Sequence, residues 1–339
     1  MSLIKLRLSN FTVFSKLDME FSKGINIFVG ENGTGKTHIM KTLYAACQAS
    51  RKTVSFSQKL VKVFRPDDLN INRLVSRGKG GDTAQIEVVS DKSTMSTKFT
   101  TRTKKWESET TGEEKWENVN AELISTFIPA KEILANAYQF ESAYHKDVID
   151  FDETYLDIIA SAKIDINRGP NTVGKKKYLD RLKDITLGTV TISDEKFYLK
   201  PGTQAKIEFH LVAEGLRKLA LLWQLIKNGT LEKGTILFWD EPEANLNPVA
   251  IPALVEILLE LQREGVQIFI STHDYVLSKY FEIRATEADD DIRYFSLYKN
   301  EDGSVSFDQC SNFRELRKNP IISAYDKLLD EVLDKNMGD

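Results

Sequence analysis

The clearest chemical pattern in the sequence is GENGTGKT at residues 30–37, which matches G-x-x-x-x-G-K-[ST] at every fixed position. Its glycines let the backbone curl so that successive N–H groups point inward, toward an anion. Lys36 would place an ammonium between the β- and γ-phosphates of a nucleotide, and the Thr37 hydroxyl would bind Mg²⁺. We therefore predict a phosphate loop, with nucleotide contacts from Gly30, Glu31, Asn32, Gly33, Thr34, Gly35, Lys36, Thr37 and His38.

Two adjacent acids, Asp240 and Glu241, follow the apolar run ILFW at residues 236–239. A buried strand with this ending can aim its first carboxylate at a metal and its second at an attacking water. We therefore assign Asp240 to Mg²⁺ and Glu241 to general-base catalysis. Taken alone, the two acids could equally be hydrated side chains at a strand end. The phosphate loop in the same chain favours the catalytic interpretation.

A second apolar run, IFIST at residues 268–272, ends in His273. An imidazole at this point could donate a hydrogen bond to a γ-phosphate or hold the attacking water. A lone histidine at a strand end is more often a simple polar cap. Because His273 follows the acidic pair in chain order, we predict that it contributes to catalysis.

The segment VAEGLRK at residues 212–218 opens a helix, with Gly215 near its start. A small residue at a helix N-terminus allows close approach of a phosphate, so Gly215 is a candidate nucleotide contact. An ordinary helix start with a charged surface explains the same residues equally well.

These side chains need strands and helices to hold them together. Residues 24–30 read as an apolar strand, and residues 36–49 place apolar side chains at helical spacing. Helices and strands then alternate, which predicts a parallel sheet with helices on its faces. The alternating segments are residues 215–227, 234–239, 248–263, 266–271 and 275–281.

The remaining segments carry weaker signals. We expect two strands within residues 3–21, a hairpin of residues 85–89 and 94–103, and a strand at 123–128 ended by Pro129. Residues 51–120 otherwise look poorly ordered, with a glycine-rich loop at Gly78, Gly80 and Gly81 and an exposed polar tip at 103–120. Helices are expected at residues 131–144, 153–163, 175–183 and 321–333, short strands at 189–193, 197–199 and 205–209, and a hairpin at 294–298 and 304–308.

Composition excludes several classes of protein. The 339 residues are 41% hydrophobic and 28% charged, as in ordinary globular proteins, and they carry 46 basic against 50 acidic side chains, a net charge of −4. No apolar run approaches the roughly 18 residues that span a bilayer, and the N-terminus lacks a hydrophobic signal core. Two cysteines, Cys47 and Cys310, provide no disulfide framework. We expect a cytoplasmic protein without membrane contact.

The motifs together resemble the ABC-type ATPase fold, and within it the soluble RecF, SMC and OLD (overcoming lysogenization defect) ATPases, often described as AAA-type. The resemblance rests on GENGTGKT, on EGLRK at residues 214–218, on LFWDEPEANLNP at 237–248 and on ISTHD at 270–274. The N-terminal sequence LRLSNFTVF at residues 6–14 is similar too. Residues 1–50, 121–135 and 186–335 carry the resemblance.

The resemblance implies ATP and Mg²⁺ as ligands and a head-to-tail homodimer with two ATP molecules between its subunits. Residues 212–218 would then stand where the ABC signature contacts the partner's ATP, residues 243–248 would cross the dimer seam, and His273 would be the switch histidine. The sequence departs from the family at Ala213, which replaces the usual signature serine, and at Glu214, which replaces a glycine. Thr12 stands where a basic residue is usual, and residues 129–131 lack the usual glutamine.

Two further features stay open between a functional and a structural explanation. Phe11 and Phe14 could stack on adenine, although aromatic residues near a first strand are more often core residues. The basic clusters at residues 102–105 and 175–177 could contact nucleic acid, although short charged runs are usually hydrated surface.

We therefore predict an α/β protein, an ABC-type ATPase head of the P-loop NTPase class. Residues 1–128 and 186–339 would form this head, with its mixed, mostly parallel sheet and an N-terminal β-subdomain, and residues 129–185 an inserted helical lobe. The predicted function is Mg²⁺-dependent ATP hydrolysis by a homodimer that regulates a separate protein effector, such as a nuclease or toxin, in bacterial antiviral defence or toxin control. The alternatives are a DNA-repair or DNA-clamping ATPase of RecF or SMC type and, less favoured, the energising subunit of a transporter.

Overall fold

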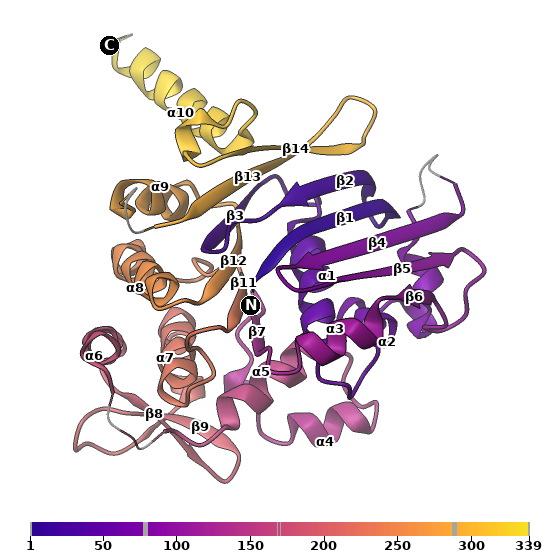
Figure 1. The fold of residues 1–339 in the computed structure, drawn as a ribbon. Coiled ribbons are helices and arrows are strands. Elements are labelled where there is room, and N and C mark those ends of the chain that lie inside the picture. The colour runs from indigo at the N-terminus through magenta and orange to yellow at the C-terminus, as the bar shows by residue number, and fades with distance from the viewer. Residues whose placement is uncertain (1, 77–80, 168, 170, 287–289, 338–339) are drawn as a thin grey trace.

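A computed structural model describes the whole chain except residues 1, 77–80, 168, 170, 287–289 and 338–339 (Figure 1). A six-stranded sheet lies at its centre, in the spatial order β14-β13-β3-β12-β11-β7. Neighbouring strands are parallel except for β13 with β14. The strands are β3 (Ile25–Gly30), β7 (Ser125–Ile128), β11 (Ile236–Asp240), β12 (Gln267–Thr272), β13 (Ile292–Lys299) and β14 (Val305–Cys310). The carboxyl ends of β3, β11 and β12 therefore meet at one edge.

Both faces of this sheet are buried, because successive side chains of its strands enter two different hydrophobic cores. On β11, Leu237 and Trp239 belong to one core, and Ile236 and Phe238 belong to the other. The first core is covered by α7 (Glu214–Lys227), α8 (Ile251–Arg263) and α9 (Tyr275–Arg284), which stack on the left in Figure 1. The second core is covered by α1 (Lys36–Ala49) and a second sheet. Burial on both faces explains the continuous apolar runs of β3, β11 and β12.

The second sheet is antiparallel and has five strands in the order β2-β1-β4-β5-β6. It comprises β1 (Leu3–Phe11), β2 (Phe14–Glu20), β4 (Thr83–Ser90), β5 (Thr94–Thr100) and β6 (Glu109–Thr111). The predicted α/β class, with a mixed and mostly parallel sheet and an N-terminal β-subdomain, is confirmed. Phe11 and Phe14 are fully buried in the second core, with Phe11 packed edge-on against Phe64 and Phe99. Neither ring is free to stack on adenine.

The structure has more order between residues 51 and 120 than the sequence suggested. Helix α2 (Phe56–Phe64) begins at Ser55, whose hydroxyl accepts a hydrogen bond from the Gln58 amide. Residues 103–120 are not simply an exposed tip, because they contain β6 and α3 (Glu113–Val119). Trp116 of α3 is fully buried, and its indole N–H donates to the Ala46 carbonyl oxygen at 2.9 Å. Gly78 and Gly80 of the predicted loop lie outside the described residues.

The region from 129 to 185 contains helices, but they share a core with the rest of the molecule. It holds α4 (Phe140–His145), α5 (Glu153–Lys163) and α6 (Val173–Thr186). Ile158 of α5 and Leu182 of α6 lie in the core beneath α7 and α8. The continuous helix expected over residues 131–144 is wrong, because Gln139 adopts a left-handed backbone that separates α4 from the turn before it. A small antiparallel sheet of β8 (Thr189–Ser193), β9 (Lys196–Lys200) and β10 (Ile207–Glu208) follows.

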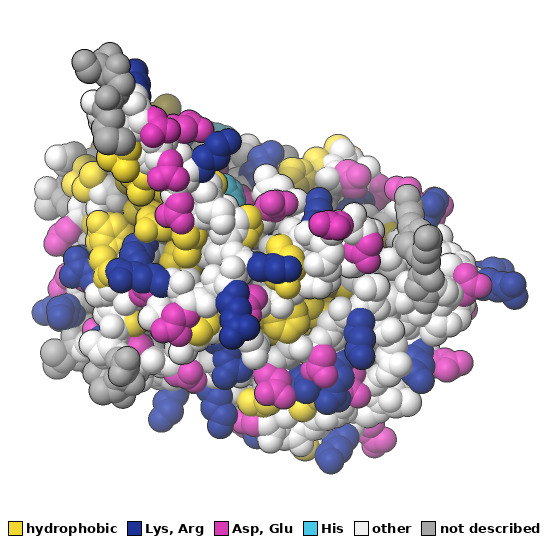
Figure 2. Space-filling model, turned by 90° about the horizontal axis from the view of Figure 1, so that it is seen from above, with side chains coloured by type: hydrophobic (Ala, Val, Ile, Leu, Met, Phe, Trp, Pro, Cys, Tyr) yellow, Lys and Arg dark blue, Asp and Glu magenta, His cyan; other side chains and the backbone are white. Residues whose placement is uncertain are grey.

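The C-terminal helix α10 (Pro320–Met337) projects from the rest of the molecule (Figure 1). Figure 2 shows apolar side chains gathered on the face of the molecule that carries this helix. Those of α10 that are exposed are Tyr325, Leu328, Leu329, Val332 and Leu333. Within the described ranges, every helix is too short or too polar to act as a bilayer-spanning segment.

Candidate active site

The phosphate loop connects β3 to α1 and has the backbone that its glycines were expected to provide. Gly30, Gly33 and Gly35 all have positive φ, and Gly35 at +90° directly precedes the first residue of α1. A Cβ on Gly35 would also lie 2.5 Å from Cζ of Phe14 and 2.7 Å from Cγ2 of Val13. The Phe14 ring therefore packs directly against the loop at Gly35. Only glycine fits this turn, on both backbone and steric grounds.

Lys36 is buried within the loop. Its ammonium donates to the carbonyl oxygens of Gly30 at 2.7 Å and Glu31 at 3.0 Å. Burial lowers the pKa of Lys36, while Glu241 and Asp240 act in the opposite direction. The ammonium therefore contacts the loop backbone and is close enough to the two acids that the sequence singled out to interact with their charges. This is the position from which an ammonium can neutralise phosphate oxygens.

Thr37, in the first turn of α1, lies against Asp240 at the end of β11. The Thr37 hydroxyl lies 3.0 Å from Oδ2 and 3.1 Å from Oδ1 of Asp240. The hydroxyl of Ser271, at the end of β12, also donates a hydrogen bond to Asp240. Burial raises the pKa of Asp240 despite these two hydrogen bonds. The sequence analysis missed Ser271, although the parallel register that pairs it with Asp240 would have indicated it.

Glu241 and His273 form the outer part of the same site. The Nδ1 atom of His273 lies 3.2 Å from Oε1 of Glu241, and both side chains are partly open to solvent. Glu241 has φ of +48°, and its amide donates to the Ser271 carbonyl oxygen at 2.9 Å. The turn after β11 therefore directs Glu241 away from the buried strand and toward the end of β12.

His38 is the third residue of α1, but its ring faces inward. Its centroid lies 5.3 Å from that of Phe64, and its buried Nδ1 has no hydrogen-bond partner among the residues that the structure describes. Burial lowers its pKa to about 4, so the imidazole is neutral near pH 7. Its predicted role as a nucleotide contact stays a prediction.

Gly215 is buried at the start of α7, and the structure supplies a reason for the glycine within the same chain. A Cβ at Gly215 would lie 2.9 Å from Cα of Leu246 and closer still to the Asn245 carbonyl oxygen. The close approach that requires glycine is therefore between α7 and the loop after β11. In contrast, Ala213, immediately before α7, is exposed.

Two buried carboxylates, Glu243 and Glu132, were given no individual role from the sequence, although Glu243 begins the segment expected to cross the dimer seam. Glu243 accepts a hydrogen bond from the Thr272 hydroxyl at 2.6 Å, and burial raises its pKa to about 7. Glu132 pairs with Arg217 of α7 at 2.6 Å, and Arg217 also donates to the Val212 carbonyl oxygen at 2.8 Å. The start of α7 is therefore fixed to the segment that follows β7.

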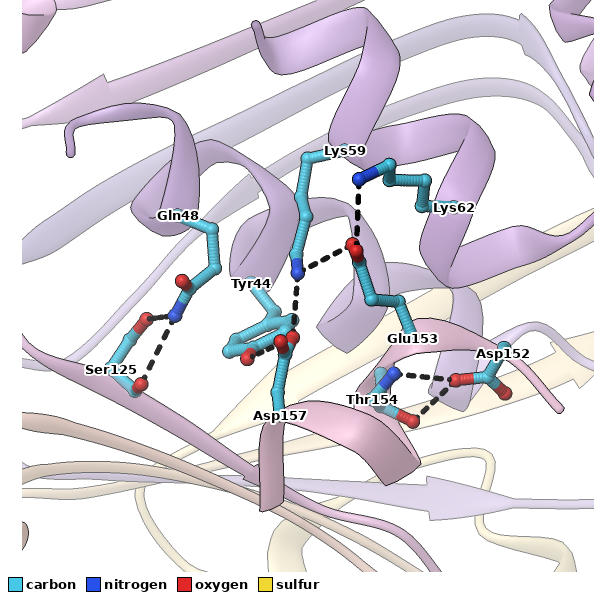
Figure 3. A network of polar contacts seen from close by, with 9 residues as sticks. All are labelled: Tyr44, Gln48, Lys59, Lys62, Ser125, Asp152, Glu153, Thr154 and Asp157. Carbon is cyan, nitrogen blue, oxygen red and sulfur yellow. Dashed lines mark hydrogen bonds and ion pairs between the residues drawn. The ribbon is translucent and has the colours of Figure 1, made fainter. Parts of the chain in front are cut away.

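A polar network ties the helix of the phosphate loop to α5 (Figure 3). The ammonium of Lys59, on α2, lies 2.7 Å from Glu153 and 2.6 Å from Asp157, both on α5. Tyr44 of α1 donates to the same Asp157 oxygen at 2.7 Å. Lys41 of α1 also pairs with Asp152 at 2.8 Å. Because Asp152 caps α5, any shift of α1 has to be accommodated by α5.

The donor set suits Mg²⁺ and a polyphosphate. The hydroxyl of Thr37 and the carboxylate of Asp240 are hard oxygen ligands, which Mg²⁺ prefers, and the hydrogen bond between them shows that they reach a common point. The positive-φ glycines and Lys36 supply the N–H groups and the cation that bind phosphate oxygens. Thr37 and Asp240 would therefore hold the metal, and residues 30–37 the phosphates.

Comparison with known families identifies the chain. A family described as "AAA domain, putative AbiEii toxin, Type IV TA system" matches residues 108–279, and one described as "AAA ATPase domain" matches residues 1–79. The first match spans half of the chain. The protein belongs to this AAA-domain family. It contains a P-loop ATPase domain, as the sequence motifs predicted.

Curated relatives match only part of the chain. The DNA replication and repair protein RecF of Streptococcus suis is 35% identical over 80 residues, which cover 24% of this chain and 22% of that protein. RecF of Clostridium kluyveri is 41% identical over 56 residues, covering 16% and 15%. The chain therefore spans less than a quarter of the length of these relatives.

Solved structures match nearly the whole chain. An Smc head bound to the C-winged helix domain of ScpA has a TM-score of 0.57 at 13% identity, covering 93% of this chain and 99% of that one. The SMC head domain of Thermotoga maritima has a TM-score of 0.51 at 14% identity, covering 91% and 99%. At these identities the likeness establishes the fold alone, that of an SMC-type ATPase head.

Proposed function

We propose that this protein binds and hydrolyses ATP with Mg²⁺ at the shared edge of β3, β11 and β12, and that two copies join head to tail around the nucleotide. The observation that carries the proposal is the convergence of Thr37 with Asp240 and of Glu241 with His273 at this edge. Each pair joins groups that the sequence assigned to one reaction. Mg²⁺, when bound, would neutralise charge that develops on the phosphates.

Each residue has a separate role in this proposal. Lys36 and the loop amides bind and orient the phosphates, and Thr37 and Asp240 hold the metal. Glu241 accepts a proton from the attacking water, because its carboxylate is partly open to solvent at the outer end of the site. His273 contacts this carboxylate and orients it or the water.

The dimer is supported by the surface around the start of α7. Leu211 and Val249 are large apolar residues that stay exposed, and they flank α7 and the loop that packs against Gly215. Ala213 lies exposed between them in the chain. A second copy that presents its phosphate loop to this face would cover these side chains and bring its nucleotide to the N-terminus of α7.

We propose further that ATP binding and hydrolysis in the cytoplasm regulate a separate protein effector. The family description, which includes a toxin of a toxin–antitoxin system, supports an effector such as a toxin or nuclease in bacterial defence. Membership of the OLD subgroup is a prediction within the same proposal. The matches to RecF favour the second candidate, a DNA-repair or DNA-clamping ATPase.

Phosphate release by the purified protein, measured with and without Mg²⁺, tests the ATPase. Lys36→Ala should lower the rate at least about 100-fold, because it removes the cation of the phosphate loop. Lys16→Ala, which alters an exposed lysine of β2, is the matched control and should not change the rate. Near-normal turnover by Lys36→Ala would refute the proposed site.

Duplex DNA binding, followed by fluorescence anisotropy over a range of salt concentrations, separates the two candidate roles. The effector role predicts weak binding that salt abolishes, since the net charge is −4. A submicromolar complex that tolerates salt would favour the DNA-repair role.

A further inference from the structure

Lys218 is a second buried lysine beside the acidic pair. It lies on α7 with 1% of its surface exposed. Its ammonium donates to the backbone carbonyl oxygen of Glu241 at 3.2 Å. Lys36 approaches the acids from the phosphate loop, whereas Lys218 approaches them from the helix that we place at the dimer seam. No role was assigned to Lys218 from the sequence.

Burying a lysine at this position destabilises the fold unless its ammonium makes favourable interactions. The neighbouring residues on the same helix, Leu219 and Leu222, are fully buried and apolar. Burying an ammonium disfavours its charged form, and burial lowers the pKa of Lys218. The carboxylates that counter this effect are Glu214, Glu243, Glu241 and Asp240. An apolar side chain would fill the same space without the desolvation cost.

Lys218 binds the carbonyl oxygen of Glu241, a residue with a strained backbone. Glu241 has φ of +48°, a left-handed conformation that is unfavourable for a non-glycine residue. Such a conformation persists only when its surroundings hold it. The Glu241 amide donates to Ser271 at 2.9 Å, and the Glu241 carbonyl accepts from Lys218 and from the Ala244 amide at 3.1 Å. Of these partners, Lys218 is the one that belongs to α7.

We propose that Lys218 is a positioning residue for the general base: its ammonium holds the left-handed Glu241 peptide and so directs the Glu241 carboxylate toward His273. This inference rests on the proposed function, because it presupposes that Glu241 is the base. It also gives α7 a direct connection to catalysis. A movement of α7 at the dimer seam would reach Glu241 through one hydrogen bond, without passing through the phosphate loop.

The test compares Lys218→Met, Lys218→Arg and the control Lys227→Met, which alters a lysine at the far end of the same helix. Single-turnover phosphate release and the Kd for Mg-ATP are measured for each variant. Lys218→Met should hydrolyse ATP at least about tenfold more slowly, with a Kd within about twofold of the wild type. Lys218→Arg keeps the charge and should recover most of the rate, and Lys227→Met should behave as wild type.

A second measurement separates positioning from general destabilisation. Lys218→Met in the Glu241→Gln background should cause no further loss of rate, because the residue acts through Glu241. An equal loss in both backgrounds, or an arginine variant as slow as the methionine one, would overturn the inference. If Lys218→Met does not fold, Lys218→Gln supplies the neutral comparison.

Failure of the inference can be told apart from failure of the proposed function. If Glu241→Gln is inactive and Lys218→Met hydrolyses ATP at the wild-type rate, Glu241 remains the general base and the inference about Lys218 is wrong. If Glu241→Gln hydrolyses ATP normally, the assignment of the base is wrong, and the inference is overturned with it.

Discussion

The Nδ1 atom of His273 lies 3.2 Å from Oε1 of Glu241, although the two residues follow different strands. The contact exists because β11 and β12 are parallel neighbours, with Asp240 opposite Ser271 in the register. Residues just beyond these strand ends therefore meet at the same edge of the sheet. The pair places an imidazole against the carboxylate that we assign to proton transfer.

Glu241→Gln should retain ATP binding and lose most hydrolysis. The amide keeps the size of the side chain and a hydrogen-bonding oxygen, but it cannot take a proton from water. Asp240 and the phosphate loop are unchanged, so bound ATP should persist and the dimer should accumulate. Light scattering with and without Mg-ATP, alongside phosphate release, measures both effects. Loss of ATP binding would instead mean that Glu241 is a metal ligand.

His273→Ala should slow hydrolysis by about 10- to 100-fold, less than Glu241→Gln, because the histidine acts beside the base. His145→Ala is a suitable control, since His145 is exposed on α4. The double variant of Glu241 and His273 should be no slower than Glu241→Gln alone, because the two residues work as one unit. The hydrolysis rates are measured by rapid quench. If the fold-losses of the two single variants multiplied in the double variant, the two side chains would act independently.

Asp240→Asn should raise the Mg²⁺ concentration needed for half-maximal ATPase activity by at least about tenfold. The substitution removes the anionic ligand but retains an oxygen that can accept from Thr37 and Ser271. Ser271→Ala should have a smaller effect, because it removes a hydrogen bond and leaves the charge. A magnesium titration that is unchanged in Asp240→Asn would remove this residue from the metal site.

Ala213→Arg should permit ATP binding and prevent ATP-dependent dimerisation. Ala213 is exposed, so an arginine there meets the partner and not its own core. Gly215→Arg would be a poor test, because the new side chain would collide with Asn245 and Leu246 of the same chain. Sedimentation velocity with Mg-ATP in the Glu241→Gln background measures the dimer. Normal dimerisation of Ala213→Arg would place the interface elsewhere.

Glu243→Gln should change how stability depends on pH. Glu243 has its pKa raised by burial from 4.5 to about 7 in the folded protein. Between these values the unfolded chain releases a proton that the folded protein keeps, so stability falls as pH rises and the loss is complete above about pH 7. The shift corresponds to about 3 kcal/mol, and the glutamine, which cannot ionise, should remove this loss.

Urea unfolding without nucleotide at about pH 5 and about pH 8 measures the effect of Glu243. Relative to wild type, Glu243→Gln should gain stability at the higher pH. Glu232→Gln, on a loop away from the site, controls for removing one negative charge. A stability difference between Glu243→Gln and wild type that does not vary with pH would contradict the shifted pKa.

Local patterns in the chain determined the motifs and most of the elements around them. Burial on both faces of the central sheet produces apolar runs that can be read directly, and the glycine spacing of residues 30–37 specifies a turn that few other residues can adopt. The helix at Lys36–Ala49 and the strand before it follow from these patterns. Trp116 and α2 were missed because their burial depends on α1 and the antiparallel sheet, which are distant in the sequence.

Only the tertiary structure decided which groups meet. The fully buried state of Phe11 and Phe14, the intrachain reason for Gly215, and the contacts of Ser271 and Lys218 all depend on the register and packing of separate segments. A side-chain pattern reports whether a residue prefers water or the interior, but it does not report which residue lies opposite. The types of catalytic group could therefore be predicted from the sequence. The positioning of Glu241 between His273 and Lys218, in contrast, arises from the packing of α7 against the end of β11.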